Sequence, residues 1–304
     1  MTYTVTLDNA PTTEETFTFD VNGEQQTITV AANELTGSTN FTFNDPDVFL
    51  DDNVISAPTN FSGSDNSGYE DLVLVNNATS HEVDDTIDTV NATLTSSLLA
   101  AGGNEDGATV TYTVTLDNAP TTEETFTFDV NGEQQTITVA ANELTGSTNF
   151  TFNDPDVFLD DNVISAPTNF SGSDNSGYED LVLVNNATSH EVDDTIDTVN
   201  ATLTSSLAAG GNEDGATVTY TVTLDNAPTT EETFTFDVNG EQQTITVAAN
   251  ELTGSTNFTF NDPDVFLDDN VISAPTNFSG SDNSGYEDLV LVNNATSTTP
   301  PRSR

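Results

Sequence analysis

The carboxylates are the side chains of this sequence that could do chemistry, because they gather in clusters that recur along the chain. In the first period the clusters are Asp45, Asp47, Asp51 and Asp52; Asp65, Glu70 and Asp71; Glu82, Asp84, Asp85 and Asp88; and Glu105 with Asp106 beside Asn104. Several stand among Gly, Pro, Asn and Ser residues, which predicts loops whose backbone carbonyls can join the carboxylates around a hard cation.

Oxygen donors of this kind favour calcium. Calcium accepts six to eight oxygens at roughly 2.3–2.6 Å, whereas magnesium demands a stricter octahedron. Zinc and copper lack their usual ligands here, apart from one histidine in each connector. The first cluster recurs as Asp154, Asp156, Asp160 and Asp161, and as Asp262, Asp264, Asp268 and Asp269. We expect calcium at one or more clusters, and the alternative is ordinary solvated surface charge, since no cluster has EF-hand spacing.

The charge balance excludes whole classes of function. The chain has 51 acidic residues, only 2 cationic ones, and a net charge of −49. Both cations, Arg302 and Arg304, lie in the tail, so the repeats offer nothing to bind phosphate and we expect no nucleic-acid partner. No apolar run approaches the roughly 18 residues of a membrane span, so we expect no membrane insertion in this segment. Self-repulsion among the acids must be offset by metal ions or by salt.

No constellation typical of an enzyme is present. The chain has no cysteine and the repeats have no lysine, and we find no serine nucleophile motif. Repetition of a block multiplies length and valency rather than chemistry, so we expect no enzymatic activity.

A single long block organises the chain. Thr2–Ser80 recurs without substitution at Thr111–Ser189 and at Thr219–Ser297. A period of this size exceeds a solenoid turn of roughly 20–50 residues, which predicts a domain with its own core in each period. We expect domains at 1–83, 84–192 and 193–297, an unstructured tail at 298–304, and hinges at 81–88 and 190–197.

Strict alternation of apolar residues predicts strands. Val110, Tyr112, Val114 and Leu116 alternate with threonines, and Asn131-Gly132 is typical of a tight turn between two alternating segments, 125–130 and 135–140. About seven such segments fill each period. The fold class we expect is therefore all-β, a tandem array of immunoglobulin-like β-sandwich domains of about seven strands each, joined by short acidic linkers.

The connector before each later block contains a further strand, Thr89–Ser97 or Thr198–Ser206. If it is the first strand of the following domain, the first repeat lacks its own and should be the least stable, with an exposed edge. The chain has the pattern of a fragment of a longer array. His81 and His190 in the connectors are either solvated linker residues or, less simply, a pH sensor or metal ligand.

The amino-acid sequences of several segments, and their order along the chain, resemble those of a known family. The run Tyr112–Thr122, the Asn-Gly hairpin, Asp156–Asp160, Gly177–Leu183 and Asp194–Asp197 are similar to the tandem immunoglobulin-like extender repeats of giant RTX adhesins, which Gram-negative bacteria secrete by type I systems. The resemblance covers essentially all of residues 2–297. The glycine-rich nonapeptide repeats and the C-terminal secretion signal of that family are absent here.

The resemblance implies a passive, extracellular role at the bacterial cell surface. The repeats would form a monomeric stalk that projects an adhesive domain, with neighbouring repeats and calcium ions as the partners. By motif position, the implied linker ligands are Asp84, Asp85, Asp88, Glu105, Asp106, Asp193, Asp194, Asp197, Glu213 and Asp214.

Two other functions stay open on sequence alone. Each repeat could hold a glycan through bridging calcium, in which case repetition would supply multivalency. Alternatively, the chain could be a surface-layer repeat whose acids are adapted to high salt rather than to calcium.

Overall fold

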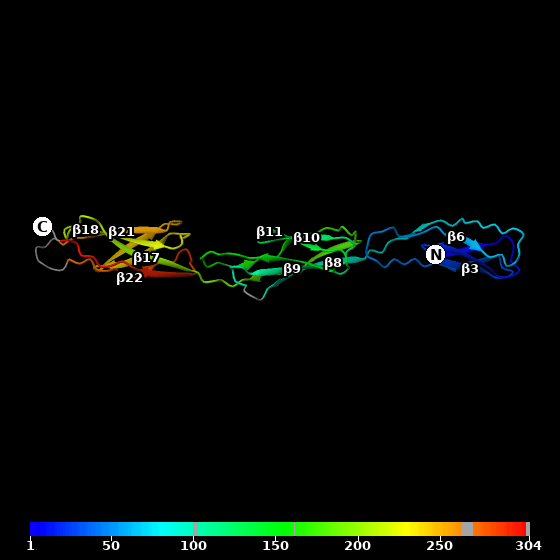
Figure 1. The fold of residues 1–304 in the computed structure, drawn as a ribbon, viewed down its shortest axis with the longest axis horizontal. Helices are drawn as coiled ribbons and strands as arrows, with labels where there is room; N and C mark the ends of the chain where they lie inside the picture. Colours follow the sequence, from blue (N-terminus) through cyan, green and yellow to red (C-terminus); the bar gives the residue numbers. More distant parts are fainter. Residues whose placement is uncertain (100–102, 161, 263–269, 302–304) are drawn as a thin grey trace.

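The computed structural model describes residues 1–99, 103–160, 162–262 and 270–301. Three β-rich units follow one another along one long axis, with the chain termini in the two outer units (Figure 1). The described residues contain strands and turns and no helix. The all-β tandem array expected from the sequence is confirmed. Within this part of the chain no helix has the length and apolarity needed to cross a bilayer.

The middle repeat is a sandwich of two sheets. One sheet has the strand order β12-β9-β8-β15 and the other β11-β10-β14, and a short pair, β13-β16, lies beside them. The strands are β8 (Thr89–Leu98), β9 (Thr109–Leu116), β10 (Glu124–Val130), β11 (Glu133–Val139), β12 (Thr145–Thr151), β13 (Val163–Ile164), β14 (Thr168–Gly172), β15 (Asp180–Asn185) and β16 (His190–Glu191).

The third repeat has the same architecture, with sheet orders β21-β18-β17-β23 and β20-β19-β22. Its strands are β17 (Thr198–Leu207), β18 (Ala216–Leu224), β19 (Glu232–Val238), β20 (Glu241–Val247), β21 (Thr253–Phe260), β22 (Thr276–Gly280) and β23 (Asp288–Asn293). Thr298, at the start of the expected tail, exchanges two 2.9 Å backbone hydrogen bonds with Ile272.

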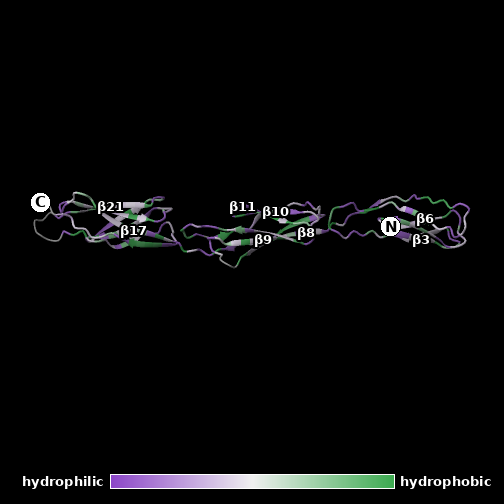
Figure 2. Ribbon diagram, in the orientation of Figure 1, coloured by the Kyte–Doolittle hydropathy of each residue, from purple (hydrophilic) through white to green (hydrophobic). Residues whose placement is uncertain are grey.

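Alternation builds the core between the sheets, as period-two patterning requires. Val110, Tyr112 and Val114 of β9 are fully buried and face Phe126 and Phe128 of β10 within one apolar cluster. Both hydrophobic and hydrophilic colouring appear along the strands in Figure 2. The predicted hairpin is confirmed, since Asn131 (φ 47°) and Gly132 (φ 79°) both adopt positive φ between β10 and β11.

The first repeat differs from the other two. Its strands are β1 (Thr2–Thr6), β2 (Glu15–Val21), β3 (Glu24–Val30), β4 (Thr36–Asn40), β5 (Val54–Ile55), β6 (Thr59–Gly63) and β7 (His81–Glu82). They form a β3-β2-β6 sheet, but on the opposite face β1 pairs with β4 alone. This repeat therefore contains no counterpart of β8 or β15 among its described residues.

The hinges are shorter than the sequence predicted. His81–Glu82 pairs with Val54–Ile55, and His190–Glu191 pairs with Val163–Ile164, so each segment opens as a strand of the preceding repeat. The His190 ring Nε2 also lies 2.9 Å from the Ser96 hydroxyl. Strand pairing draws these residues into the sandwich, and the connecting segment begins only after them.

Candidate metal centre at the joints between repeats

Each joint forms where an acidic loop of one repeat docks on a turn of the next. Phe49 stacks on Tyr178 with ring centroids 5.1 Å apart and planes inclined by 21°. Backbone hydrogen bonds flank the rings, from Leu50 N to Gly177 O at 2.7 Å and from Glu179 N to Val48 O at 2.9 Å. The joint is thus a short antiparallel bridge with an aromatic pair on it.

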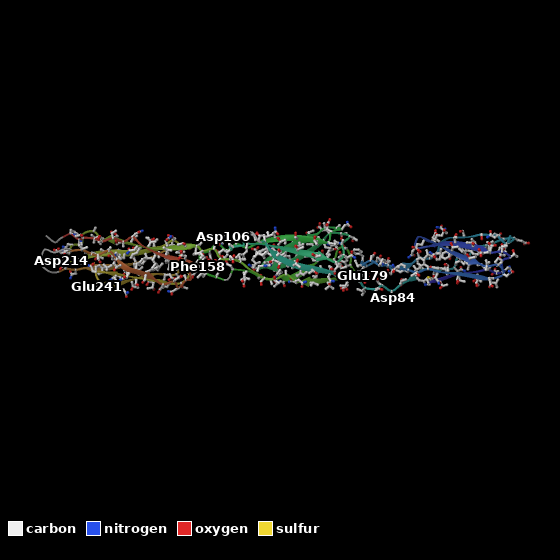
Figure 3. The ribbon with its side chains drawn as sticks, turned by 90° about the horizontal axis from the view of Figure 1, so that it is seen from below. Asp84, Asp106, Phe158, Glu179, Asp214 and Glu241 are labelled. Carbon is white, nitrogen blue, oxygen red and sulfur yellow. The ribbon has the colours of Figure 1, made fainter. Side chains whose placement is uncertain are left out.

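The second joint repeats this arrangement. Phe158 stacks on Tyr286 at 5.1 Å and 22°, and Leu159 N donates to Gly285 O at 2.8 Å. The Tyr286 hydroxyl donates to Asn226 O at 3.0 Å, which fixes the ring within its own repeat. Figure 3 shows Phe158 and Asp106 near this joint, and Asp84 and Glu179 near the first.

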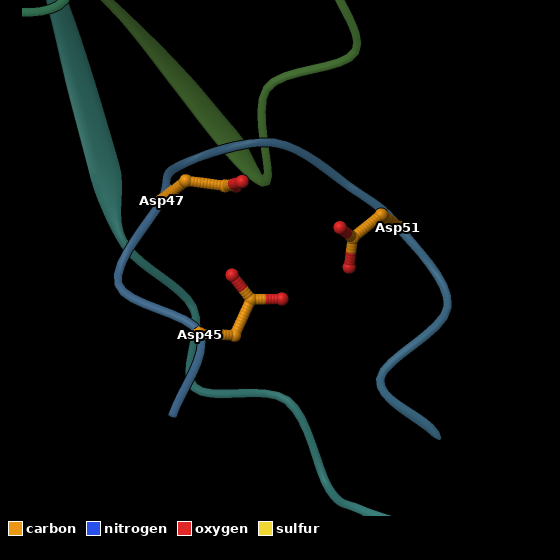
Figure 4. Close-up of side chains that lie close together, drawn as sticks. All are labelled: Asp45, Asp47 and Asp51. Carbon is orange, nitrogen blue, oxygen red and sulfur yellow. The ribbon is translucent and has the colours of Figure 1, made fainter. Parts of the chain in front are cut away.

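The docking loop carries the first acidic cluster. Asp45, Asp47 and Asp51 bring a carboxylate oxygen each to within 4.8 Å of one another, and their side chains converge inside the bend of the loop (Figure 4). Asp47 Oδ1 also accepts a 2.9 Å hydrogen bond from Phe49 N, so the cluster shapes the turn that presents the ring. Partial desolvation and then the charges of Asp45 and Asp47 raise the pKa of Asp51.

The equivalent loop of the middle repeat has the same geometry. Asp154, Asp156 and Asp160 form a second trio within 4.8 Å, and Asp156 Oδ1 accepts from Phe158 N at 2.7 Å. Asp52 is exposed and stands outside the first trio. Asp161, Asp264, Asp268 and Asp269 lie outside the described residues, whereas Asp262 is described and its N–H donates to Glu213 O at 2.8 Å.

A third cluster joins three segments at the second joint. Glu105 comes from the middle repeat, Asp194 from the linker and Glu287 from the third repeat, again with oxygens within 4.8 Å. Glu105 is only 2% exposed. Asn162 Nδ2 donates to Glu105 Oε2 at 2.7 Å and to Asp194 Oδ1 at 3.1 Å, while Glu287 Oε2 accepts from Asp197 N.

This third cluster concentrates negative charge around one buried carboxylate, that of Glu105. Burial, followed by a hydrogen bond to Asp194 and that residue's charge, raises the pKa of Glu105 to about 7. Burial, then the charges of Asp194, Asp197 and Asp156, raise the pKa of Glu287, although the Asp197 N–H opposes the rise. Two buried acceptors here, Asn162 Oδ1 and Glu287 Oε1, have no hydrogen-bond partner among the described residues. Unpaired buried acceptors are costly, so the geometry favours a cation at this point.

A family model matches this chain at residues 88–195 and 197–300, under the description LapA domain. The chain belongs to the LapA domain family. A solved structure described as a tetra-tandem repeat in the extending region of a large adhesion protein is 18% identical, with a TM-score of 0.31, and the match covers 89% of this chain and 64% of that one. This chain therefore spans less than two thirds of that protein's length. No curated protein matches it.

The two complete LapA domains bring some predicted ligands together and leave others apart. Glu105 joins Asp194, and each docking loop gathers three aspartates, but Asp52, Asp84, Asp85 and Asp214 enter no described cluster of three. Asp106 Oδ2 accepts from Thr195 Oγ1 at 3.3 Å, and Asp193 takes part through its backbone, which bridges Asn104. Asp88 and Asp197 contribute N–H groups to Glu179 and Glu287, respectively. Glu213 accepts from the amide of Asn270, which repeats the Glu105–Asn162 pair at the far end of the third repeat.

Sequence reasoning missed the partners that come from the next LapA domain. Glu287 and its counterpart Glu179 were visible as part of the Gly-Tyr-Glu-Asp clusters, but nothing in the sequence placed these clusters across the joint. Asn162 was missed because it carries no charge. The aromatic pairing was missed because Phe158 and Tyr286 belong to different repeats.

Proposed function

We propose that this chain is a stalk segment of a bacterial cell-surface adhesin, in which LapA domains act as extracellular spacers and calcium ions clamp the joints between them. One observation carries the proposal. At the second joint, carboxylates from two repeats and the linker meet in one cluster, Glu105, Asp194 and Glu287, in which Glu105 is buried and which no side-chain cation of the repeats neutralises. A cation bound there would tie three separate segments together.

Calcium suits this donor set on chemical grounds. The cluster offers carboxylate oxygens, and the unpaired amide oxygen of Asn162 adds a neutral donor, which is the mixture that calcium accepts in irregular geometry. The raised pKa of Glu105 is the cost of burying this charge without a counterion. A divalent ion removes that cost and supplies the missing partner for the orphaned acceptors.

By mass action, calcium binding then controls the stiffness of the joints. A ligand that binds only the docked joint stabilises it by RT ln(1 + [L]/Kd), which amounts to about 2.7 kcal/mol at a hundred times Kd. At low free calcium, repulsion among the acids leaves the joints loose. At high free calcium outside a cell, the same acids hold neighbouring repeats in line.

Distances measured across the second joint test the proposal directly. Because the chain has no cysteine, spin labels can be placed at Glu133→Cys and Glu241→Cys, two exposed positions one period apart. We expect a narrow distance distribution in calcium and a broad one in EDTA or in magnesium with high NaCl. Glu105→Gln should broaden it in calcium, whereas Glu123→Gln, which changes an exposed neighbour of a strand, should not. Narrowing by salt alone would favour the salt-adapted alternative.

A further inference from the structure

The first and the last long strands of each complete repeat lie side by side and run in the same direction. β8 pairs with β15 from Thr89 opposite Asp180 to Leu94 opposite Asn185, and β17 pairs with β23 in the same way. The chain therefore enters this strand pair at one end of the repeat and leaves it at the other. A pull along the stalk displaces the two strands past each other instead of peeling them apart.

We propose that each complete repeat is a tension-bearing unit, in which load along the stalk is resisted by shear between its parallel first and last strands. In shear, the ladder hydrogen bonds carry the force together and must break nearly at once. In peeling they break one after another, each worth only about 0.5–1.5 kcal/mol. The inference rests on the proposed stalk function, because only a stalk is loaded at its ends.

Polar contacts lock the strand pair at the end where the chain enters. Asp88 N donates to Glu179 Oε2 at 2.5 Å, and Thr89 Oγ1 donates to Asp180 Oδ2 at 3.0 Å. The equivalent bonds recur in the third repeat, where Thr198 Oγ1 donates to Asp288 Oδ2 at 3.0 Å. These residues join the force-bearing strand directly to the first residues of its partner.

A second lock lies at the exit. The Ser96 hydroxyl accepts from Thr188 N at 3.0 Å and lies 2.9 Å from His190 Nε2, so one side chain of β8 holds the segment that follows β15. Asn186 N donates to Leu94 O at 2.9 Å just before it. The serine neighbour Ser97 is exposed, which makes it a matched control.

The buried side chains of β8 also oppose its lengthwise displacement. Val90, Ala92 and Leu94 of β8 are at most 1% exposed, and they anchor the strand in the same core that Tyr112 and Phe128 fill. Displacing β8 lengthwise therefore drags apolar groups through a close-packed interior. The described residues of the first repeat include no counterpart of β8, so we expect this unit to unfold at a lower force although its block sequence is identical.

Single-molecule pulling of the full chain in EDTA, where no calcium clamp acts, tests the inference. Handles on Thr89→Cys and Asn186→Cys load β8 and β15 in shear, while handles on Thr89→Cys and Asp180→Cys peel the same strands. We expect a several-fold higher rupture force in the first geometry, with a length gain of roughly 300 Å at about 3.3–3.6 Å per residue. Equal forces in the two geometries would overturn the proposal. Adding calcium tests the joints separately, so a failed clamp and a failed shear mechanism remain distinguishable.

The serine lock gives a second, smaller test in the same apparatus. Ser96→Ala should lower the shear force and leave the peeling force unchanged, whereas Ser97→Ala should change neither. Circular dichroism confirms that both variants fold. A shear force that is the same in Ser96→Ala and Ser97→Ala would remove the exit lock from the mechanism.

Discussion

The block Thr2–Ser80 of the first repeat is identical to Thr111–Ser189 of the second, yet the two repeats differ in one of their two sheets. Residues 72–76 of the first repeat form no strand, whereas their counterparts in the second form most of β15. Val73 is 69% exposed and the equivalent Val182 only 37%. The difference lies outside the block, in β8, which pairs with β15 in the second repeat and has no counterpart among the described residues of the first.

The place of the missing strand is an open groove. A cavity of about 270 Å³ lies between β1 and the segment around Val75, lined by Tyr3, Val5 and Phe61 among others. In the second repeat β8 fills the equivalent place and pairs with β9 on one side and β15 on the other. Residues 181–185 therefore become a strand because a partner strand is present, which is the context dependence expected of β-structure.

Supplying the missing strand should produce the largest change. Residues 84–110 placed before Thr2 of the isolated first repeat, in place of Met1, should raise its free energy of unfolding by about 3–5 kcal/mol, because a Val and a Leu would become fully buried. Urea unfolding measures the gain. The same addition carrying Leu94→Asp should give little of it. An unchanged midpoint with the intact strand would show that the open groove is not what sets the first repeat apart.

An acid-sensitive network should behave alike in both kinds of repeat. Glu15 and Glu232 are fully buried. Desolvation raises the pKa of each, but hydrogen bonds from the two serines and the asparagine of a Ser-Asp-Asn-Ser loop outweigh it and lower the pKa overall. Above the unfolded-state pKa of about 4.3, the glutamate is ionised in both the folded and the unfolded protein, and its hydrogen bonds stabilise the fold fully. Because the folded-state pKa is lower, this stabilisation is lost as the pH falls toward that pKa.

The measurement is urea unfolding between neutral pH and about pH 3 for the first and third repeats. We expect Glu232→Gln to cost about 1.5–3 kcal/mol at neutral pH and to flatten the acid loss, since it weakens hydrogen bonds to a buried charge. Glu231→Gln is the control, because that side chain is exposed. A flat acid profile in the first repeat alone would show that this network also depends on the missing strand.

The aromatic bridge should produce the smallest change. Phe158→Ala removes a ring pairing worth about 0.5–1.5 kcal/mol beyond its buried area. We expect it to broaden the spin-label distance across the second joint, most visibly in EDTA, while Leu159→Ala, 63% exposed beside it, has little effect. If the distance distributions of the two variants are equally wide, the aromatic pair does not hold the joint, and the acidic residues alone must do so.

Local patterns in the sequence were enough to predict most of the fold. Alternation predicted β9 and β10, and Asn131-Gly132 predicted the hairpin of β10 and β11, because turn and strand signals act between near neighbours. The connector strand was predicted at 89–97 and observed as β8, Thr89–Leu98. Its parallel partner in β15 could not be predicted, since that pairing spans almost the whole repeat and depends on topology.

Of the candidate site, only some of the charged residues could be predicted from the sequence. Glu105 and Asp194 were predicted to act at a linker, and they do lie together, but Glu287 arrives from the next repeat and Asn162 is neutral. The two joints also differ in a way that no local pattern reveals. Asn53 has an unpaired buried oxygen like Asn162, but the described first repeat has no counterpart of Glu105 to face it. We therefore expect the second joint to bind calcium more tightly than the first.

Calorimetric titration of calcium into the metal-free chain shows whether the joint binds an ion. We expect Glu105→Gln to lose at least one tight site relative to the unsubstituted chain, while Glu123→Gln retains all of them. Identical stoichiometry and affinity in all three proteins, or no calcium binding in any, would contradict the proposal that an ion clamps the joint between Glu105, Asp194 and Glu287.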